Sequence, residues 1–391
     1  MICGCIFLFL IKKMRATKIL VLLLFVIPSA MAQDAPTAYN EGLVLKKEKN
    51  TRAALEKFKQ ASGLRADYIE ALYEMGWCYN ELKDYTNSLA TFRKVLPFWP
   101  PIPKVHFETG YAFEKQNQYD SALFYYNRCI TLKPDYALAY KQLAYIAYTK
   151  SGDNAIVLQA FEKYESIETK EIKDYLFWYR KGFTQNALQD YAGAKTSLDK
   201  SLLLKQDYTN TFLELGFACN KLKQAEDAID FYKRAIALEP TSHIGYNGIA
   251  EVYRDTKKDI EEAMTWYKKT LELNANERKA HYGMGYCFNS KEQYSNAIMH
   301  LKKAIAAETT YTAAYVELGY SYFKTNDYTQ AETNLKKALQ LNDKNENARY
   351  YMGLMYISQG NKARAQQMVT ELKALQSKNA ASLQGKVDQM N

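Results

Sequence analysis

Residues 312–345 read TAAYVELGYSYFKTNDYTQAETNLKKALQLNDKN, and this stretch decides the fold. Gly319 is followed twelve residues later by Ala331 and, after four more, by Leu335. Spacings of three and four place residues on one face of a helix. Small residues on such a face let two helices approach closely, and large residues fill the space beside them. The stretch therefore predicts a pair of closely packed helices.

The same pattern recurs ten times along the 391 residues. If the small residue is numbered position 8 of each repeat, the intervals between repeats are 34, 34, 34, 38, 34, 34, 35, 34 and 34 residues. Repeat 7 fits after one inserted residue, and repeat 4 is degenerate around 151–174. The ten residues at position 8 are Gly42, Gly76, Gly110, Ala144, Gly182, Gly216, Ala250, Gly285, Gly319 and Gly353.

This spaced pattern resembles the tetratricopeptide repeat (TPR) family, whose 34-residue helix–turn–helix unit has small residues at positions 8, 20 and 27. The resemblance implies an all-α, right-handed superhelical solenoid with a concave and a convex surface. We expect repeats 1–4 over 35–174, repeats 5–10 over 175–379, and a cap or frayed tail over 380–391. Because one repeat cannot bury its apolar face alone, neighbouring repeats must stabilise each other. The 38-residue interval between Ala144 and Gly182 predicts a bend or a subdomain junction.

Residues 1–32 have the parts of a secretory signal peptide. A basic region ending at Lys18 precedes the apolar run 19–27 and the small residues before Gln33. This order predicts export with cleavage after Ala32 and a periplasmic or secreted mature protein. The alternative is a membrane anchor, but each apolar run is too short to span a bilayer. Met14 is an alternative start, and the absence of a cysteine after the cut gives no indication of a lipoprotein.

Composition describes a folded protein with no bias toward nucleic acid. Apolar residues make up 48% and charged residues 24% of the chain, which is ordinary for a globular protein. Loss of the four positive charges in residues 1–32 lowers the formal net charge from +9 to +5, and this mild excess does not single out nucleic acid as a partner. The remaining cysteines fall at core-type positions and are expected to be buried thiols, with a disulfide as the alternative; they are Cys78, Cys129, Cys219 and Cys287.

An aromatic row at position 9 is the first candidate for partner binding. In the resembling family the first helix of each repeat lines a concave groove where peptides or partner helices dock. Tyr and Trp provide large contact areas at low entropy cost. The alternative is that these rings pack between adjacent first helices. The row consists of Trp77, Tyr111, Tyr145, Phe183, Phe217, Tyr286 and Tyr320, and it is interrupted by Glu251.

Asparagines at position 12 are the second candidate. Their amides can donate to and accept from the backbone of an extended peptide. Because position 12 lies in the last turn of the first helix, C-terminal capping is the alternative. These residues are Asn80, Asn186, Asn220 and Asn289.

Paired basic residues at positions 25 and 26 of the second helix form a possible ridge. Such a ridge would suit an anionic membrane or polysaccharide, but the favoured interpretation is a solvated face of the second helix. The pairs are Arg93-Lys94, Lys233-Arg234, Lys268-Lys269, Lys302-Lys303 and Lys336-Lys337.

Catalytic chemistry is not visible in the sequence. The four histidines lack metal-ligand spacing, and there is no phosphate-binding loop or nucleophile elbow. We therefore expect no enzyme activity, metal or cofactor, and no membrane-spanning segment in the mature chain. The sequence indicates a scaffold that binds a protein or peptide partner in its groove. The alternative is a structural component of an envelope assembly that uses its flank, ends or basic convex face. Either is compatible with a homo-oligomer.

Overall fold

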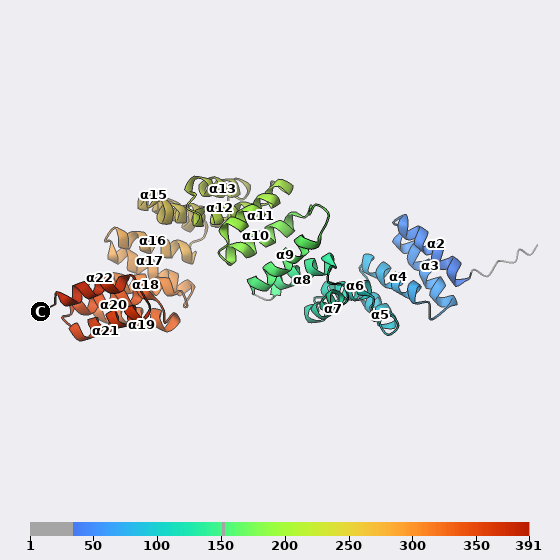
Figure 1. Cartoon of the computed structure of the whole chain (residues 1–391). Helices are drawn as coiled ribbons and strands as arrows, with labels where there is room; N and C mark the ends of the chain where they lie inside the picture. The colour runs from blue at the N-terminus through green and yellow to red at the C-terminus, as the bar shows by residue number, and fades with distance from the viewer. Residues whose placement is uncertain (1–33, 151–152, 391) are drawn as a thin grey trace, which may run out of the picture. The chain divides into compact units, whose positions relative to one another are not determined.

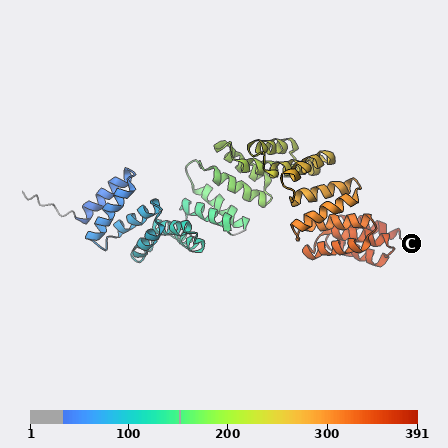
Figure 2. The same cartoon turned by 180° about the vertical axis from the view of Figure 1, so that it is seen from behind.

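A computed structural model describes residues 34–150 and 153–390. The predicted signal peptide lies outside the described residues. The chain divides into two compact units, residues 1–171 and residues 172–391. In the described part of the chain every regular element is helical. Within each unit, consecutive helices pack as antiparallel hairpins (Figure 1, and from behind in Figure 2).

Residues 34–150 and 153–171, the described part of the first unit, form four hairpins, repeats 1–4. The helices are α2 (Ala35–Lys47), α3 (Thr51–Leu64), α4 (Ile69–Glu81), α5 (Tyr85–Val95), α6 (Pro103–Lys115), α7 (Tyr119–Leu132), α8 (Ala137–Lys150) and α9 (Asn154–Ile167).

The second unit holds six hairpins, repeats 5–10, and a final helix. The helices are α10 (Tyr175–Ala187), α11 (Tyr191–Leu204), α12 (Thr209–Lys221), α13 (Ala225–Leu238), α14 (His243–Val252), α15 (Ile260–Leu273), α16 (Arg278–Ser290), α17 (Tyr294–Ala307), α18 (Thr312–Lys324), α19 (Tyr328–Leu341), α20 (Glu346–Ser358), α21 (Lys362–Ala374) and α22 (Asn379–Asp388), and the π-helical turn η1 (Tyr253–Lys257) follows α14.

The small residue at position 8 is the point of closest approach within a hairpin, as the sequence predicts. A Cβ atom added to Gly216 would lie 2.8 Å from the Tyr232 ring, which is shorter than any normal contact. Tyr232 comes from position 24 of the second helix and is 4% exposed. This hairpin can therefore close as tightly as it does because Gly216 has no side chain.

The turn between the two helices of a hairpin is also regular. Its central residue, position 15, has a left-handed backbone in nearly every repeat, as at Lys83 (φ 63°) and Gln189 (φ 65°). In most repeats the following residue caps the second helix, as where the Asp84 carboxylate accepts a hydrogen bond from the Asn87 amide at 3.2 Å; Gln118, Gln224 and Gln293 make no such cap. Such a cap satisfies one of the free amides at the helix start.

The chain departs from the regular repeat at two places, the inserted residue of repeat 7 and the helix that follows repeat 10. The inserted residue of repeat 7 is taken up by η1, because a π-helical turn holds one more residue than an α-helical turn. At the end of the second unit, α22 packs on α20 and α21, and Leu383 occupies the space in front of Gly353. Leu383 and Val387 are buried, so α22 caps the apolar end of repeat 10.

Candidate functional site on the first helices

The predicted aromatic row lies on the first helices, and all seven rings are half-buried. Three of them make the same contact, an edge-on pair with the Tyr that begins the second helix of the preceding repeat. The ring centroids of Tyr111 and Tyr85 are 6.4 Å apart, those of Phe217 and Tyr191 6.0 Å, and those of Tyr320 and Tyr294 6.3 Å. Edge-on pairs fix a ring by one edge, and half-burial leaves part of each ring open to solvent.

Cations lie beside several rings of the row. The Lys46 ammonium is 3.8 Å from the centre of the Trp77 ring, and Lys221 is 5.3 Å from Phe217. Arg254 lies 5.7 Å from Tyr286. These distances are within the range of cation–π attraction, so the first-helix face combines aromatic surface with positive charge.

The asparagines at position 12 connect consecutive first helices. The Asn80 amide donates to the Glu108 carbonyl at 3.0 Å and to its carboxylate at 2.8 Å. Asn186 makes the same two bonds to Glu214, and Asn289 makes them to Glu317. Each Glu stands 28 residues after its Asn, at position 6 of the next repeat.

We call each of these Asn–Glu pairs a lateral tie. In a lateral tie the Asn side chain donates to another residue of the protein, and the Glu carboxylate that accepts is largely shielded from water. Burial raises the pKa of Glu108 to about 7 and also raises the pKa of Glu214 and Glu317. Asn220 differs, because position 6 of the next repeat is Gly248; its carbonyl oxygen instead accepts from the Thr256 hydroxyl at 2.7 Å. In three of the four asparagines the side-chain amide N–H groups already donate hydrogen bonds within the protein. The partner-binding role of these asparagines stays a prediction.

In the second unit the first-helix face is hollowed into a cavity of about 610 Å³, here called the first-helix cavity. It brings together three of the predicted residues, Phe183, Asn186 and Phe217. Tyr286, Tyr320, Asn220 and Asn289 belong to the same unit but do not line it. Trp77, Asn80, Tyr111 and Tyr145 belong to the other unit.

The cavity also contains residues that the sequence analysis missed. Ile244 and Lys279 occupy position 2 of their repeats, and Lys221 occupies position 13. Positions 2, 5, 9 and 13 follow one another at spacings of three and four, so they share one helix face. Following the helix face of the position-9 row two turns toward the helix start and one turn toward its end would have identified them.

The polar groups of the cavity include unsatisfied acceptors. Asn247 is 7% exposed and donates to the Glu251 carboxylate at 3.0 Å. Within the described residues, the side-chain carbonyl oxygens of Asn186 and Asn247 accept no hydrogen bond. Buried acceptors without partners are costly, and a ligand that supplies N–H groups would satisfy them.

Two histidines that are far apart in the sequence meet in repeat 8. The Nδ1 atoms of His281 and His300 are 3.0 Å apart, and His281 Nε2 donates to the Ala275 carbonyl at 3.0 Å. Burial lowers the pKa of His300 to about 4. In the part of the chain that the structure describes, no group of three or more His, Cys, Asp and Glu side chains is placed to hold a metal.

The four described cysteines are buried free thiols, which confirms their expected core role. Burial raises the pKa of Cys78, Cys129 and Cys287 to about 12 and that of Cys219 to about 11. Thiols with such pKa values are poor nucleophiles at neutral pH. None of the helices in the described ranges is long and apolar enough to cross a membrane.

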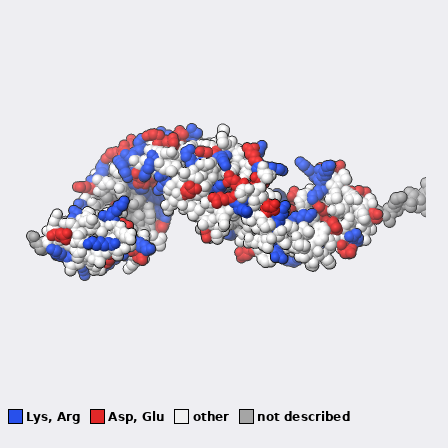
Figure 3. Space-filling model, in the orientation of Figure 1, with Lys and Arg blue, Asp and Glu red and all other residues white. Residues whose placement is uncertain are grey.

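The basic pairs on the second helices are exposed, but they are accompanied by acids. Arg234 pairs with Asp230 at 2.9 Å, and Lys336 pairs with Glu332 at 2.7 Å. The face drawn in Figure 3 shows both signs of charge interspersed. Alternating charges on a helix are typical of a solvated face.

Consecutive helical hairpins of one kind, each closed on a small residue at position 8 and stacked on its neighbours, define the class of helical repeat proteins. Models of the tetratricopeptide repeat match residues 70–96, 103–136, 210–242 and 245–277, and a model described as TPR repeat matches residues 319–360. The chain belongs to the tetratricopeptide repeat family, whose members bind protein partners.

Several known proteins are similar to parts of this chain. The human protein O-mannosyl-transferase TMTC3 is 22% identical over 66% of this chain and 30% of its own length. The human mitochondrial import receptor subunit TOM70 is 24% identical over 53% of this chain and 34% of its own length. The chain spans between 30% and 55% of the length of the curated relatives it matches. The crystal structure of the APC/C hetero-tetramer Cut9-Hcn1 is 13% identical, with a TM-score of 0.52 over 90% of both chains, and shares the fold.

Proposed function

We propose that the protein is a non-enzymatic scaffold that binds a peptide or helical segment of a protein partner along its first-helix face. The observation that supports this most directly is the first-helix cavity, because repeats 5 to 8 all contribute to it, mostly through their first helices. Phe183 and Phe217 offer half-exposed rings, and Lys221, Lys279 and Glu251 add charges of both signs. Large rings beside a few fixed polar groups are typical of recognition surfaces.

The unsatisfied carbonyl oxygens of Asn186 and Asn247 indicate which groups the ligand brings. An extended or helical peptide end presents free backbone N–H groups, which would pair with these oxygens. The small net charge gives no reason to propose nucleic acid. We also propose that the chain acts in the cell envelope or outside the cell, on the basis of residues 1–32. Sequencing of the mature N-terminus should then begin at Gln33.

A photo-crosslinking residue placed at Phe217 tests the proposed surface in cells. The matched control is the same residue at Leu203, which is 79% exposed on the second helix α11. We expect Phe217 to crosslink to a discrete partner and Leu203 to give no such product. Crosslinking from Leu203 but not from Phe217 would contradict the proposal and favour an assembly component that binds through its flank.

A further inference from the structure

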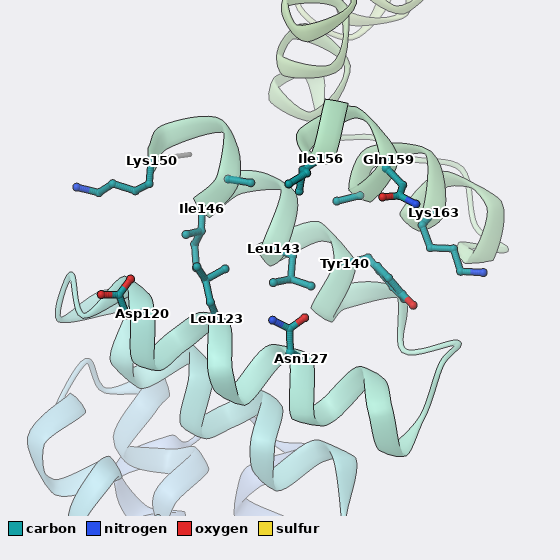
Figure 4. Close-up of a pocket in the computed structure, with 12 residues that line it drawn as sticks. Asp120, Leu123, Asn127, Tyr140, Leu143, Ile146, Lys150, Ile156, Gln159 and Lys163 are labelled. Atoms are coloured by element: carbon teal, nitrogen blue, oxygen red, sulfur yellow. The ribbon is translucent and has the colours of Figure 1, made fainter. Parts of the chain in front are cut away.

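A second cavity, of about 800 Å³, lies in repeat 4 of the first unit and is here called the repeat-4 cavity (Figure 4). It is lined by α7, α8 and α9. On α8 its lining residues include Tyr140, Leu143, Ala147 and Lys150, at positions 4, 7, 11 and 14. These positions face the second helices rather than the aromatic row, so the cavity is separate from the first-helix face.

The cavity exists because two aromatic rings are missing. In repeat 3, Phe113 at position 11 stacks on Tyr125 of the second helix, with centroids 5.5 Å apart and an interplanar angle of 11°. The equivalent residues of repeat 4 are Ala147 and Ala160, and both line the cavity. Ala160 corresponds to Tyr125 because it precedes the eighth residue of α9, as Tyr125 precedes the eighth residue of α7.

Larger residues elsewhere keep the hairpin from closing over this space. The second helix normally has small residues at its fourth and eleventh places, as Ala122 and Cys129 in α7. In α9 these places hold Val157 and Tyr164, which are 1% and 5% exposed. Because bulky side chains at positions of close approach separate helices, α9 cannot move in to fill the volume of the missing rings.

The walls of the repeat-4 cavity are aliphatic. Leu123, Leu143, Ile146 and Ile156 line it, and Ile156 is 56% exposed at the opening. Exposed aliphatic surface in a concave site favours an apolar ligand. The floor from Tyr140 to Lys150 spans ten residues of α8, which is about 15 Å at the helical rise per residue.

The two ends of the cavity differ in charge. Lys150 and Asp120 stand at one end (Figure 4), and the Lys150 ammonium lies 4.6 Å from the Tyr119 ring. At the other end stand Tyr140 and Lys163 (Figure 4). Among the described residues, no carboxylate pairs with the Lys163 ammonium. Asp120 is the one acidic residue among those that line the cavity, so the end formed by Tyr140 and Lys163 offers a positive charge and a hydroxyl donor without a lining carboxylate.

From this arrangement we propose that the repeat-4 cavity binds a medium-chain aliphatic carboxylate, a ligand of the fatty-acid type. The aliphatic tail of the ligand lies along α8 between Leu123 and Ile156, where each buried methylene group adds to the affinity. The carboxylate lies at the end formed by Tyr140 and Lys163. A protein helix with aliphatic side chains is the other occupant that would fit the walls, but it has no need of a single anionic group at one end.

Calorimetric titration of the full chain with laurate, below its micelle concentration, tests the proposal. We expect saturable binding of one laurate per chain. Dodecyltrimethylammonium, which has the same chain and the opposite charge, should bind about tenfold more weakly or not at all, because its head group would meet Lys163. Absence of laurate binding, or equal binding of both amphiphiles, would overturn the proposal.

Two variants test where the laurate binds. Ala147→Phe gives repeat 4 the ring that repeat 3 has, and it should weaken laurate binding at least about tenfold while leaving the melting temperature equal or higher. Lys163→Gln should weaken laurate binding about threefold and leave binding of dodecanol unchanged. The control is Lys94→Gln, an exposed lysine of repeat 2, which should change neither.

These variants also separate the alternatives. Laurate binding that survives Ala147→Phe would place the ligand elsewhere and contradict the proposal. A protein partner that is lost with Ala147→Phe, in a chain that binds no laurate, would assign the cavity to a protein helix instead. None of these outcomes affects the proposed role of the first-helix face, because Phe217 and the repeat-4 cavity lie in different units.

Discussion

Repeats 3 and 4 are neighbours in the first unit, yet one is filled and the other is hollow. Repeat 3 has the small residues Gly110, Ala122 and Cys129 where its helices meet, and the stacked rings of Phe113 and Tyr125 at its outer side. Repeat 4 keeps a small residue at position 8, Ala144, but has Val157 and Tyr164 in place of Ala122 and Cys129, and alanines in place of the two stacked rings. The same hairpin can thus enclose a core or a cavity, depending on where its volume is placed.

The first helices of these two repeats also differ in their lateral ties. Glu108 at position 6 of repeat 3 accepts two bonds from Asn80. The equivalent residue of repeat 4 is Gln142, and position 12 of repeat 3 is Glu114, which accepts from the Tyr126 hydroxyl at 2.7 Å. The amide–carboxylate tie therefore joins repeats 2 and 3 but is not repeated between 3 and 4.

The largest expected effect is from adding volume to the filled repeat. A Cβ atom on Gly110 would lie 2.9 Å from the Tyr126 ring and 3.3 Å from the Ala122 carbonyl oxygen. Gly110→Leu should therefore destabilise repeat 3 by about 3 kcal/mol or more. Hydrogen exchange should show loss of protection first in α6 and α7 and then in their neighbours. Equal loss over all ten repeats would contradict stabilisation by neighbours.

Removing volume from the same repeat should cost slightly less. Phe113→Ala would give repeat 3 the residue found in repeat 4, and we expect a loss of about 2–3 kcal/mol, because the half-buried ring leaves the Tyr125 stack. Exchange of the α6 amides measures this loss. An unchanged exchange rate would mean that the stacked rings do not stabilise the filled repeat.

The lateral tie should make the stability of repeat 3 depend on pH. Because burial raises the pKa of Glu108 to about 7, the folded chain holds a proton that the unfolded chain loses near pH 4.5. Proton binding by Glu108 therefore stabilises the folded state. The stabilisation is fully present below pH 4.5 and is lost as the pH rises through 7. Glu108→Gln should remove it and raise stability at pH 8 by about 1–2 kcal/mol. Urea melts of the variant and the wild type at pH 5 and pH 8 would test this, and an equal difference at both would contradict it.

The smallest expected effect is a gain. Ala147→Phe fills the repeat-4 cavity and should stabilise α8 and α9 by about 1 kcal/mol. The same exchange measurement on the α8 amides provides the check. A loss as large as that of Gly110→Leu would show that repeat 4 is as closely packed as repeat 3.

The sequence predicts the hairpins well because position 8 is determined by local packing. Gly216 and Gly319 mark close approaches that no larger residue permits. The inserted residue of repeat 7 is visible as an interval of 35, but its form as a π-helical turn depends on contacts such as that of Thr256 with Asn220. In repeat 4 the shift of the second helix by one residue hides the equivalence of Ala160 with Tyr125, so the cavity could not be predicted.

The candidate site is predicted only in part, for a related reason. The aromatic row is found by its spacing, but whether Phe217 faces solvent depends on Tyr191, which begins the second helix of the preceding repeat. The use of the asparagine amides depends on position 6 of the next repeat. Asn80 and Glu108 stand 28 residues apart, and the pairing of such distant positions is set by the stacking of repeats. Comparing positions across adjacent repeats, rather than within one, would have found the tie.

The most direct test of the first-helix surface compares two phenylalanines of α12. Phe217 is half-buried in the first-helix cavity, whereas Phe212 is 5% exposed and packs 6.4 Å from Phe231. Affinity for the partner crosslinked from position 217 and the melting temperature should be measured for Phe217→Ala and Phe212→Ala. We expect Phe217→Ala to weaken binding about thirtyfold with a small change in melting temperature, and Phe212→Ala to lower the melting temperature strongly. Unchanged binding by Phe217→Ala would contradict partner recognition on the first helices.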